Sequence, residues 1–185
     1  GDGYSEEWHA EAEKRGLPNL KTSVDAFPAL GSRKAKALFK KYKVLQHAEL
    51  ESRVTIFYEK YATTLQIESE QMVLIGRQYI LPAATRQLTQ IAEAVVATEG
   101  ADLDASNARA ALQVFSNLVD AFRDKLDALD EADNFREDDP VKHSKYLASK
   151  VIPLMNDCRE LGDRIEVHVS ADLWPLPSYR EMLFI

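Results

Sequence analysis

Two successive segments of the sequence repeat apolar residues at intervals of alternately four and three positions. The first segment lies between residues 104 and 133, and the second lies between residues 140 and 168. The repeating positions are Ala108, Leu112, Phe115, Val119, Phe122, Leu126 and Leu129, followed by Leu147, Val151, Leu154, Cys158, Leu161, Ile165 and His168. This spacing aligns the side chains on one stripe of an α-helix, so the two segments predict an antiparallel hairpin with knobs-into-holes packing.

Residues 48–99 are expected to add a further long helix, because their pattern is helical almost without interruption. Its apolar stripe is predicted at Leu50, Val54, Phe57, Tyr61, Leu65, Met72, Ile75 and Tyr79. Pro82 has no amide hydrogen and crowds the preceding turn, so we expect a kink or break near residues 79–81. No stretch alternates apolar and polar residues for long enough to predict a strand. The sequence therefore predicts an all-α fold, an elongated antiparallel bundle of three to four long helices.

The two ends of the chain predict less regular structure. Residues 1–31 are expected to form a short irregular lead-in, with one helix over residues 5–15 and only a turn near Thr22. A bundle is expected over residues 32–170, beginning with a helix that Ser32 caps, and an aromatic and proline-rich docking tail over 171–185. The chain starts without Met and ends on apolar residues, which suggests an excised C-terminal piece of a longer protein.

Composition excludes several classes of partner. The 185 residues carry 23 Lys plus Arg against 30 Asp plus Glu, a net charge of −7, so binding to nucleic acid or to an anionic membrane surface is not expected. No apolar run is long enough to span a bilayer. The single Cys fits a reducing compartment, and we expect a cytoplasmic location.

Residue patterns that carry catalysis or bind cofactors are not found. Glu6 and His9 have the spacing of a helical metal motif, but no second copy exists, so we expect no metal site. Cys158 falls on a core position and is expected to pack as a small apolar group. Without a nucleophile motif or a glycine-rich phosphate loop, the chain is expected to have no catalytic, cofactor-binding or metal-binding residue of its own.

Charge is distributed unevenly along the chain. Residues 33–43 carry six bases and no acid, whereas residues 93–139 carry thirteen acids and four bases. Each stretch can be a solvated face, or a docking face toward the other stretch, a neighbouring domain or a neighbouring subunit. Large aromatic residues in the tail either anchor an interface or pack back onto the bundle. The candidate interface residues are Arg33, Lys34, Lys36, Lys40, Lys41, Trp174, Tyr179 and Phe184.

Several segments resemble the C-terminal part of type III glutamine synthetases. These segments are Gly3-Tyr4-Ser5-Glu6-Glu7-Trp8, Glu13-Lys14-Arg15-Gly16-Leu17-Pro18-Asn19, Ala48-Glu49-Leu50-Glu51-Ser52-Arg53, Tyr58-Glu59-Lys60-Tyr61 and Asp172-Leu173-Trp174-Pro175-Leu176-Pro177-Ser178-Tyr179. Gln46-His47 replaces the family's serine cap, and residues 62–72 match the family only loosely.

The resemblance implies a parent enzyme that uses ATP and Mg²⁺ or Mn²⁺ to join ammonia to glutamate. The partners it implies are an upstream catalytic domain of the same chain and other subunits of a ring-shaped homo-oligomer. No catalytic residue of the family carries over to this chain, so a non-catalytic role in subunit packing or regulation is expected. The alternative is a free-standing acidic helical scaffold that binds a partner protein.

Overall fold

The computed structural model describes residues 3–183, and within that range every regular element is a helix. The prediction of an all-α fold is confirmed. The chain divides into two compact units, one comprising the residues up to Ala62 together with Asp138–Lys145, and the other comprising Thr63–Glu137 together with the residues from Tyr146 onward. The predicted domain boundaries at residues 31 and 170 stay predictions.

The first unit begins with helix α1 (Glu6–Lys14), as the sequence predicts. The Ser5 side chain caps it by accepting a hydrogen bond from the Trp8 amide at 3.3 Å. The helix ends at Gly16, whose φ of +68° lies in the left-handed region that glycine adopts without strain.

Helix α2 (Ser23–Leu30) corrects the expectation of a single turn near Thr22. The Thr22 side chain caps the helix through the Asp25 amide at 3.2 Å. Phe27 then packs its ring edge-on against Tyr58 of α4, with the ring centroids 4.8 Å apart. Because the sequence of this segment is interrupted by Pro28, its helix depends on that tertiary contact, which local pattern does not reveal.

Three further helices contribute to the first unit. Helix α3 (Arg33–Lys41) is capped by Ser32 as predicted, and helix α4 (His47–Ile75) follows it and continues into the second unit. The start of α7 (Pro140–Tyr146) packs here through Ser144, whose hydroxyl donates a buried hydrogen bond to the Tyr58 carbonyl at 3.1 Å.

Two π-helical segments allow proline in the long helices of the second unit. Segment η1 (Gly76–Ile80) joins α4 to α5 (Leu81–Gly100), and η2 (Leu147–Val151) joins α7 to α8 (Ile152–Glu166). In each segment, the amide of the residue before the proline donates a hydrogen bond to the carbonyl of the residue five positions earlier. The Leu81 amide donates to the Gly76 carbonyl, and the Ile152 amide donates to the Leu147 carbonyl. Of the kink or break predicted near residues 79–81, the break is therefore wrong, because the wider turn keeps the helix continuous where an α-turn would clash with Pro82. The kink stays a prediction.

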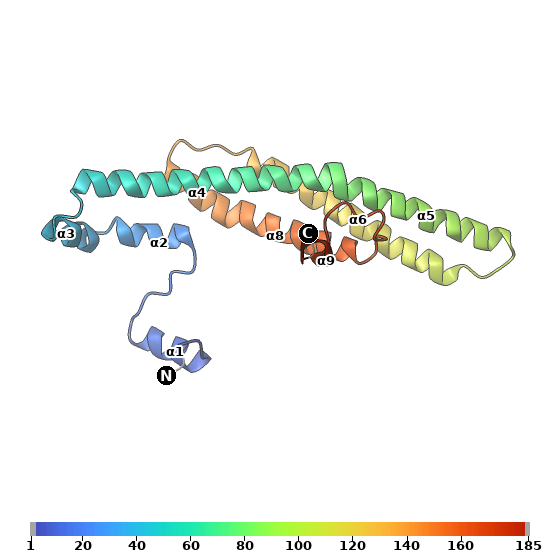
Figure 1. Cartoon of the computed structure of the whole chain (residues 1–185), viewed down its shortest axis with the longest axis horizontal. Coiled ribbons are helices and arrows are strands. Elements are labelled where there is room, and N and C mark those ends of the chain that lie inside the picture. The colour runs from blue at the N-terminus through green and yellow to red at the C-terminus, as the bar shows by residue number, and fades with distance from the viewer. Residues whose placement is uncertain (1–2, 184–185) are drawn as a thin grey trace. The chain divides into compact units, whose positions relative to one another are not determined.

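Helix α6 (Ser106–Asp133) lies between two antiparallel neighbours, α5 and α8 (Figure 1). Arg109 pairs with Glu99 near one end of the α5–α6 contact. On the α8 side, Lys125 Nζ lies 2.7 Å from Asp157 Oδ2. The predicted antiparallel hairpin is confirmed, and with the helix before α6 it makes a three-armed bundle within this unit.

The two predicted heptad stripes form the core of the second unit. The buried members are Phe115, Val119, Phe122, Leu126, Leu129, Leu147, Val151, Cys158 and Ile165. His168, at the end of its stripe, is exposed and contacts the Phe115 ring at 5.4 Å between centroids. The burial predicted for Cys158 is confirmed.

The stripe predicted for the preceding helix is partly wrong. Phe57 and Tyr79 are 41% and 48% exposed, whereas Tyr58 and Ile80 are buried. The buried positions instead run Tyr58, Ala62, Leu65, Ser69, Val73, Gly76 and Ile80. Leu50 and Leu65 are buried as predicted, but the buried stripe already differs from the predicted one at Tyr58. From Tyr58 to Ile80 successive buried positions are three or four residues apart, the spacing of a single helix face.

After α8, the chain forms a tail that packs on the second unit. The Ser170 amide donates to the Gln87 side chain of α5 at 3.0 Å. The short helix α9 (Tyr179–Leu183) closes the described part, and the Ser178 side chain at its start accepts a hydrogen bond from the Glu181 amide at 3.4 Å. No helix in residues 3–183 has the length and apolar character needed to span a membrane.

Candidate interaction surfaces

Four of the five predicted basic residues lie exposed on α3, and the fifth is engaged within the first unit. Lys36 is half-buried and forms an ion pair with Glu51 of α4. The hydrogen bond and charge of Lys36 lower the pKa of the Glu51 carboxyl. Arg33, Lys34, Lys40 and Lys41 remain at the surface.

Large apolar side chains are exposed beside these bases. Leu38 is 55% exposed and Tyr42 is 65% exposed. The Lys41 ammonium lies 5.4 Å from the centre of the Tyr42 ring, a cation–π contact. We call Lys34, Leu38, Lys41 and Tyr42 together the α3 face. Monomeric proteins expose single apolar residues routinely, whereas neighbouring exposed apolar residues mark a candidate contact surface.

Of the three predicted tail residues, only the Trp174 side chain is described. It is half-buried and lines a groove in the second unit. Tyr179 starts α9, but its side chain lies outside the described part, and Phe184 lies outside the described residues altogether.

That groove, which we call the tail groove, has a volume of about 740 Å³. It is bounded by α4, η1, α6, α8 and the tail. Its apolar lining comprises Ile67, Met72, Ile75, Ile80, Phe122, Met155, Cys158, Trp174, Leu176 and Met182. The three methionines are all those in the sequence. Sequence reasoning missed this groove because its residues come from five separate segments.

Cys158 lies in the wall of the tail groove as a protonated thiol. It is 2% exposed, and burial raises its pKa to about 11, with a smaller effect from Asp157. A thiol of that pKa is a poor nucleophile at neutral pH and does not bind metal readily.

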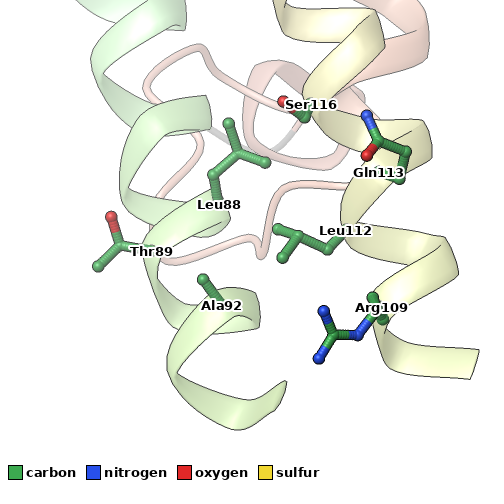
Figure 2. A pocket seen from close by; sticks show the side chains of 7 residues that line it. All are labelled: Leu88, Thr89, Ala92, Arg109, Leu112, Gln113 and Ser116. Atoms are coloured by element: carbon green, nitrogen blue, oxygen red, sulfur yellow. The ribbon is translucent and has the colours of Figure 1, made fainter. Parts of the chain in front are cut away.

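A second, smaller hollow lies between α5 and α6 and has a volume of about 480 Å³. Figure 2 shows Leu88 and Leu112 pointing toward one another across it, with Arg109 at one side. Arg109 is held by its ion pair with Glu99. The hollow therefore resembles a shallow seam between two helices more than a site with free charged groups.

Part of the acidic stretch 93–139 is engaged with bases of its own unit. Arg77 bridges Asp127 and Asp130 at 2.7 Å each, Arg109 pairs with Glu99, and Arg123 pairs with Asp120 at 3.0 Å. Such pairs between exposed groups contribute little stability individually, but they neutralise the surface locally.

Residues 3–183 contain no group of three or more His, Cys, Asp or Glu side chains arranged to hold a metal ion. Glu6 and His9 lie exposed on α1. The side chains that the structure describes therefore do not fit the Mg²⁺ or Mn²⁺ that the resemblance implies for a parent enzyme.

The described residues form an all-helical domain with exposed apolar side chains on α3 and an apolar groove beside the tail. The sequence model of the glutamine synthetase C-terminal domain matches residues 1–99, and the chain belongs to that family. The resemblance stated from the sequence is confirmed.

Three relatives match the chain over its whole length. It is 29% identical over 195 residues to a type-3 glutamine synthetase of Dictyostelium discoideum and 29% identical over 194 residues to a glutamine synthetase of Bacteroides fragilis (strain YCH46). A glutamine synthetase of Butyrivibrio fibrisolvens is 28% identical over 191 residues. The matches cover 100% of the chain but only 26 to 27% of each relative, so the chain corresponds to about a quarter of their length, the C-terminal part.

Proposed function

We propose that this chain is the non-catalytic helical domain of a glutamine synthetase and that it holds the enzyme's subunits or domains together through the α3 face. The parent enzyme would ligate ammonia to glutamate with ATP and divalent metal bound elsewhere, in the cytoplasm, as a ring-shaped homo-oligomer. The relatives' names and the family membership support this parentage, and they do not favour a free-standing acidic scaffold.

The observation that carries the docking role is the α3 face itself. One side of α3 is attached to the first unit through the Lys36–Glu51 ion pair, which fixes the helix. The other side presents Leu38 and Tyr42 to solvent between lysines. Burying these side chains against a partner would remove apolar area from water, and the lysines would select a partner surface of negative charge.

The test uses the enzyme that carries this chain, with Lys34→Glu and Lys41→Glu combined. We expect the charge reversal to reduce the particle mass measured by light scattering. A matched variant, Lys60→Glu on the exposed side of α4, should leave the mass unchanged. An unaltered assembly in the α3 variant at every concentration would remove the docking role.

The non-catalytic role has its own test. The 185-residue chain alone should show no γ-glutamyl transfer in the presence of ATP, glutamate and Mg²⁺ or Mn²⁺. Measurable turnover by the purified chain would contradict it.

A further inference from the structure

The tail groove is an apolar surface that its own unit leaves partly open. Ile67 is 55% exposed and Met182 is 50% exposed, and both line the groove with the half-buried Met72 and Met155. Methionine is unbranched and polarisable, so a surface lined by it adapts to apolar side chains of different shapes. The groove is therefore suited to receive large side chains from outside the unit.

The charged groups around the tail groove are predominantly acidic. Glu68 and Glu166 are exposed at its edge. Among the described residues that line the groove, Arg159 is the only base, and it forms an ion pair with Asp163 at 2.7 Å. Trp174 adds an aromatic face, which attracts cations. The complementary partner is thus an apolar segment that carries positive charge.

The α3 face has this composition and spacing. Lys34, Leu38 and Lys41 are four and three positions apart on a helix, and Tyr42 lies four positions after Leu38, so these side chains share one side. Apolar anchors at such intervals are the mode by which a helix docks in a groove.

From this complementarity we infer that the tail groove of one copy of the chain receives the α3 face of a second copy. The inference rests on the proposed function, because it names the partner of the same docking surface. The contact is heterologous: each copy that contributes its α3 face keeps a groove for the next copy, so association continues beyond pairs into rings or open chains.

The contact is expected to be weak in the isolated chain. A single helix face buries less than the roughly 1,000 Å² typical of stable interfaces, which corresponds to dissociation constants of about micromolar order. Acid–base contacts at its edge make it sensitive to salt.

The experiment uses the intact 185-residue chain in a Trp8→Phe background, which leaves Trp174 as the only tryptophan. Sedimentation velocity over a concentration series should show mass rising above that of the monomer, and 1 M salt should suppress the rise. Lys34→Glu with Lys41→Glu should weaken association roughly tenfold, as should Glu68→Lys with Glu166→Lys. Combining all four substitutions should restore it, a result that misfolding cannot produce.

A second readout locates the contact. A synthetic peptide of residues 32–44, titrated into the Lys34→Glu, Lys41→Glu chain, should shift the emission of Trp174 to shorter wavelength. The Glu160→Lys variant, which alters an α8 acid outside the groove, serves as the control and should respond like the parent chain.

Three results would overturn the inference. The first is a chain that stays monomeric at all concentrations. The second is a peptide that leaves the emission of Trp174 unchanged. The third is a variant with all four substitutions that fails to recover association. Binding of the peptide to a chain that never associates would exclude the second copy as the occupant. If α3 reversal disrupts the parent enzyme while reversal of Glu68 and Glu166 does not, the proposed function stands and this inference fails.

Discussion

The Ser69 hydroxyl donates a buried hydrogen bond to Asp133 Oδ1 at 2.5 Å, which links the C-terminal part of α4 to the last residue of α6. Ser69 is fully buried and Asp133 is 6% exposed. A buried carboxylate that loses its donor incurs the full cost of desolvation, so this pair is expected to matter more than the exposed ion pairs of the same unit.

Replacing Ser69 with Ala tests that expectation. We predict that Ser69→Ala lowers the free energy of unfolding by about 1–3 kcal/mol. The measurement is urea unfolding followed by Trp174 emission in the Trp8→Phe background. Ser52→Ala, at an exposed position of the same helix, should change stability by no more than about 0.5 kcal/mol. Equal effects of the two substitutions would show that the buried hydrogen bond contributes nothing.

Gly76 is predicted to resist substitution by Ala. A Cβ atom at this position would lie 2.7 Å from both Cδ atoms of Leu126, and Leu126 is fully buried. We expect Gly76→Ala to destabilise the chain by about 1–3 kcal/mol, because overpacking outweighs the gain in helix propensity. Gly100→Ala is the matched control, since no atom lies within 4 Å of its Cβ. The measurement is thermal unfolding of both variants. A Gly76→Ala chain as stable as the parent chain would contradict the predicted overpacking.

Arg77 is predicted to contribute modestly and in a salt-dependent way. It bridges Asp127 and Asp130, and their hydrogen bonds raise its pKa. Because all three groups are substantially exposed, solvent screens the interaction. Arg77→Gln should lower stability by about 0.5–1 kcal/mol at low salt and by less in 1 M NaCl. Arg86→Gln on α5 serves as the control. A loss of stability in Arg77→Gln that does not depend on salt would contradict an ionic contribution and indicate a packing contribution instead.

Cys158 is predicted to stay unreactive in the folded chain. Burial raises its pKa from 9.0 to about 11, so the native thiol remains protonated where an unfolded thiol has already ionised. This preference stabilises the fold fully below about pH 9, and the contribution is lost as the pH rises toward 11. Reaction with a chromogenic disulfide reagent at pH 8 should be negligible in buffer and complete in urea. Rapid reaction of the native chain would mean that the tail does not cover this wall of the groove.

Local pattern predicted the bundle helices well. The heptad stripes of α6 and α8 have strong single-helix periodicity, and their burial follows directly from it. The caps at Ser5 and Ser32 were also readable, because capping is a local hydrogen bond.

Features that depend on several segments were not predictable in the same way. The helix over 23–30 needs the ring of Tyr58. Tyr58 is buried in place of the predicted Phe57, at a point where Phe27 and Ser144, distant in sequence, pack against it. The tail groove is formed by residues far apart in the sequence, so no local sequence pattern predicts it.

The sequence by itself determined the all-α class, the antiparallel hairpin, the family and the uneven distribution of charge, since each depends on residue order within a segment. Tertiary structure decided which charges remain available. Packing engaged Lys36 with Glu51, paired four acids of the stretch 93–139 with nearby bases, and left the α3 face and the tail groove open. The physical reason is that a side chain's exposure and partners are set by the neighbouring elements packed against its helix.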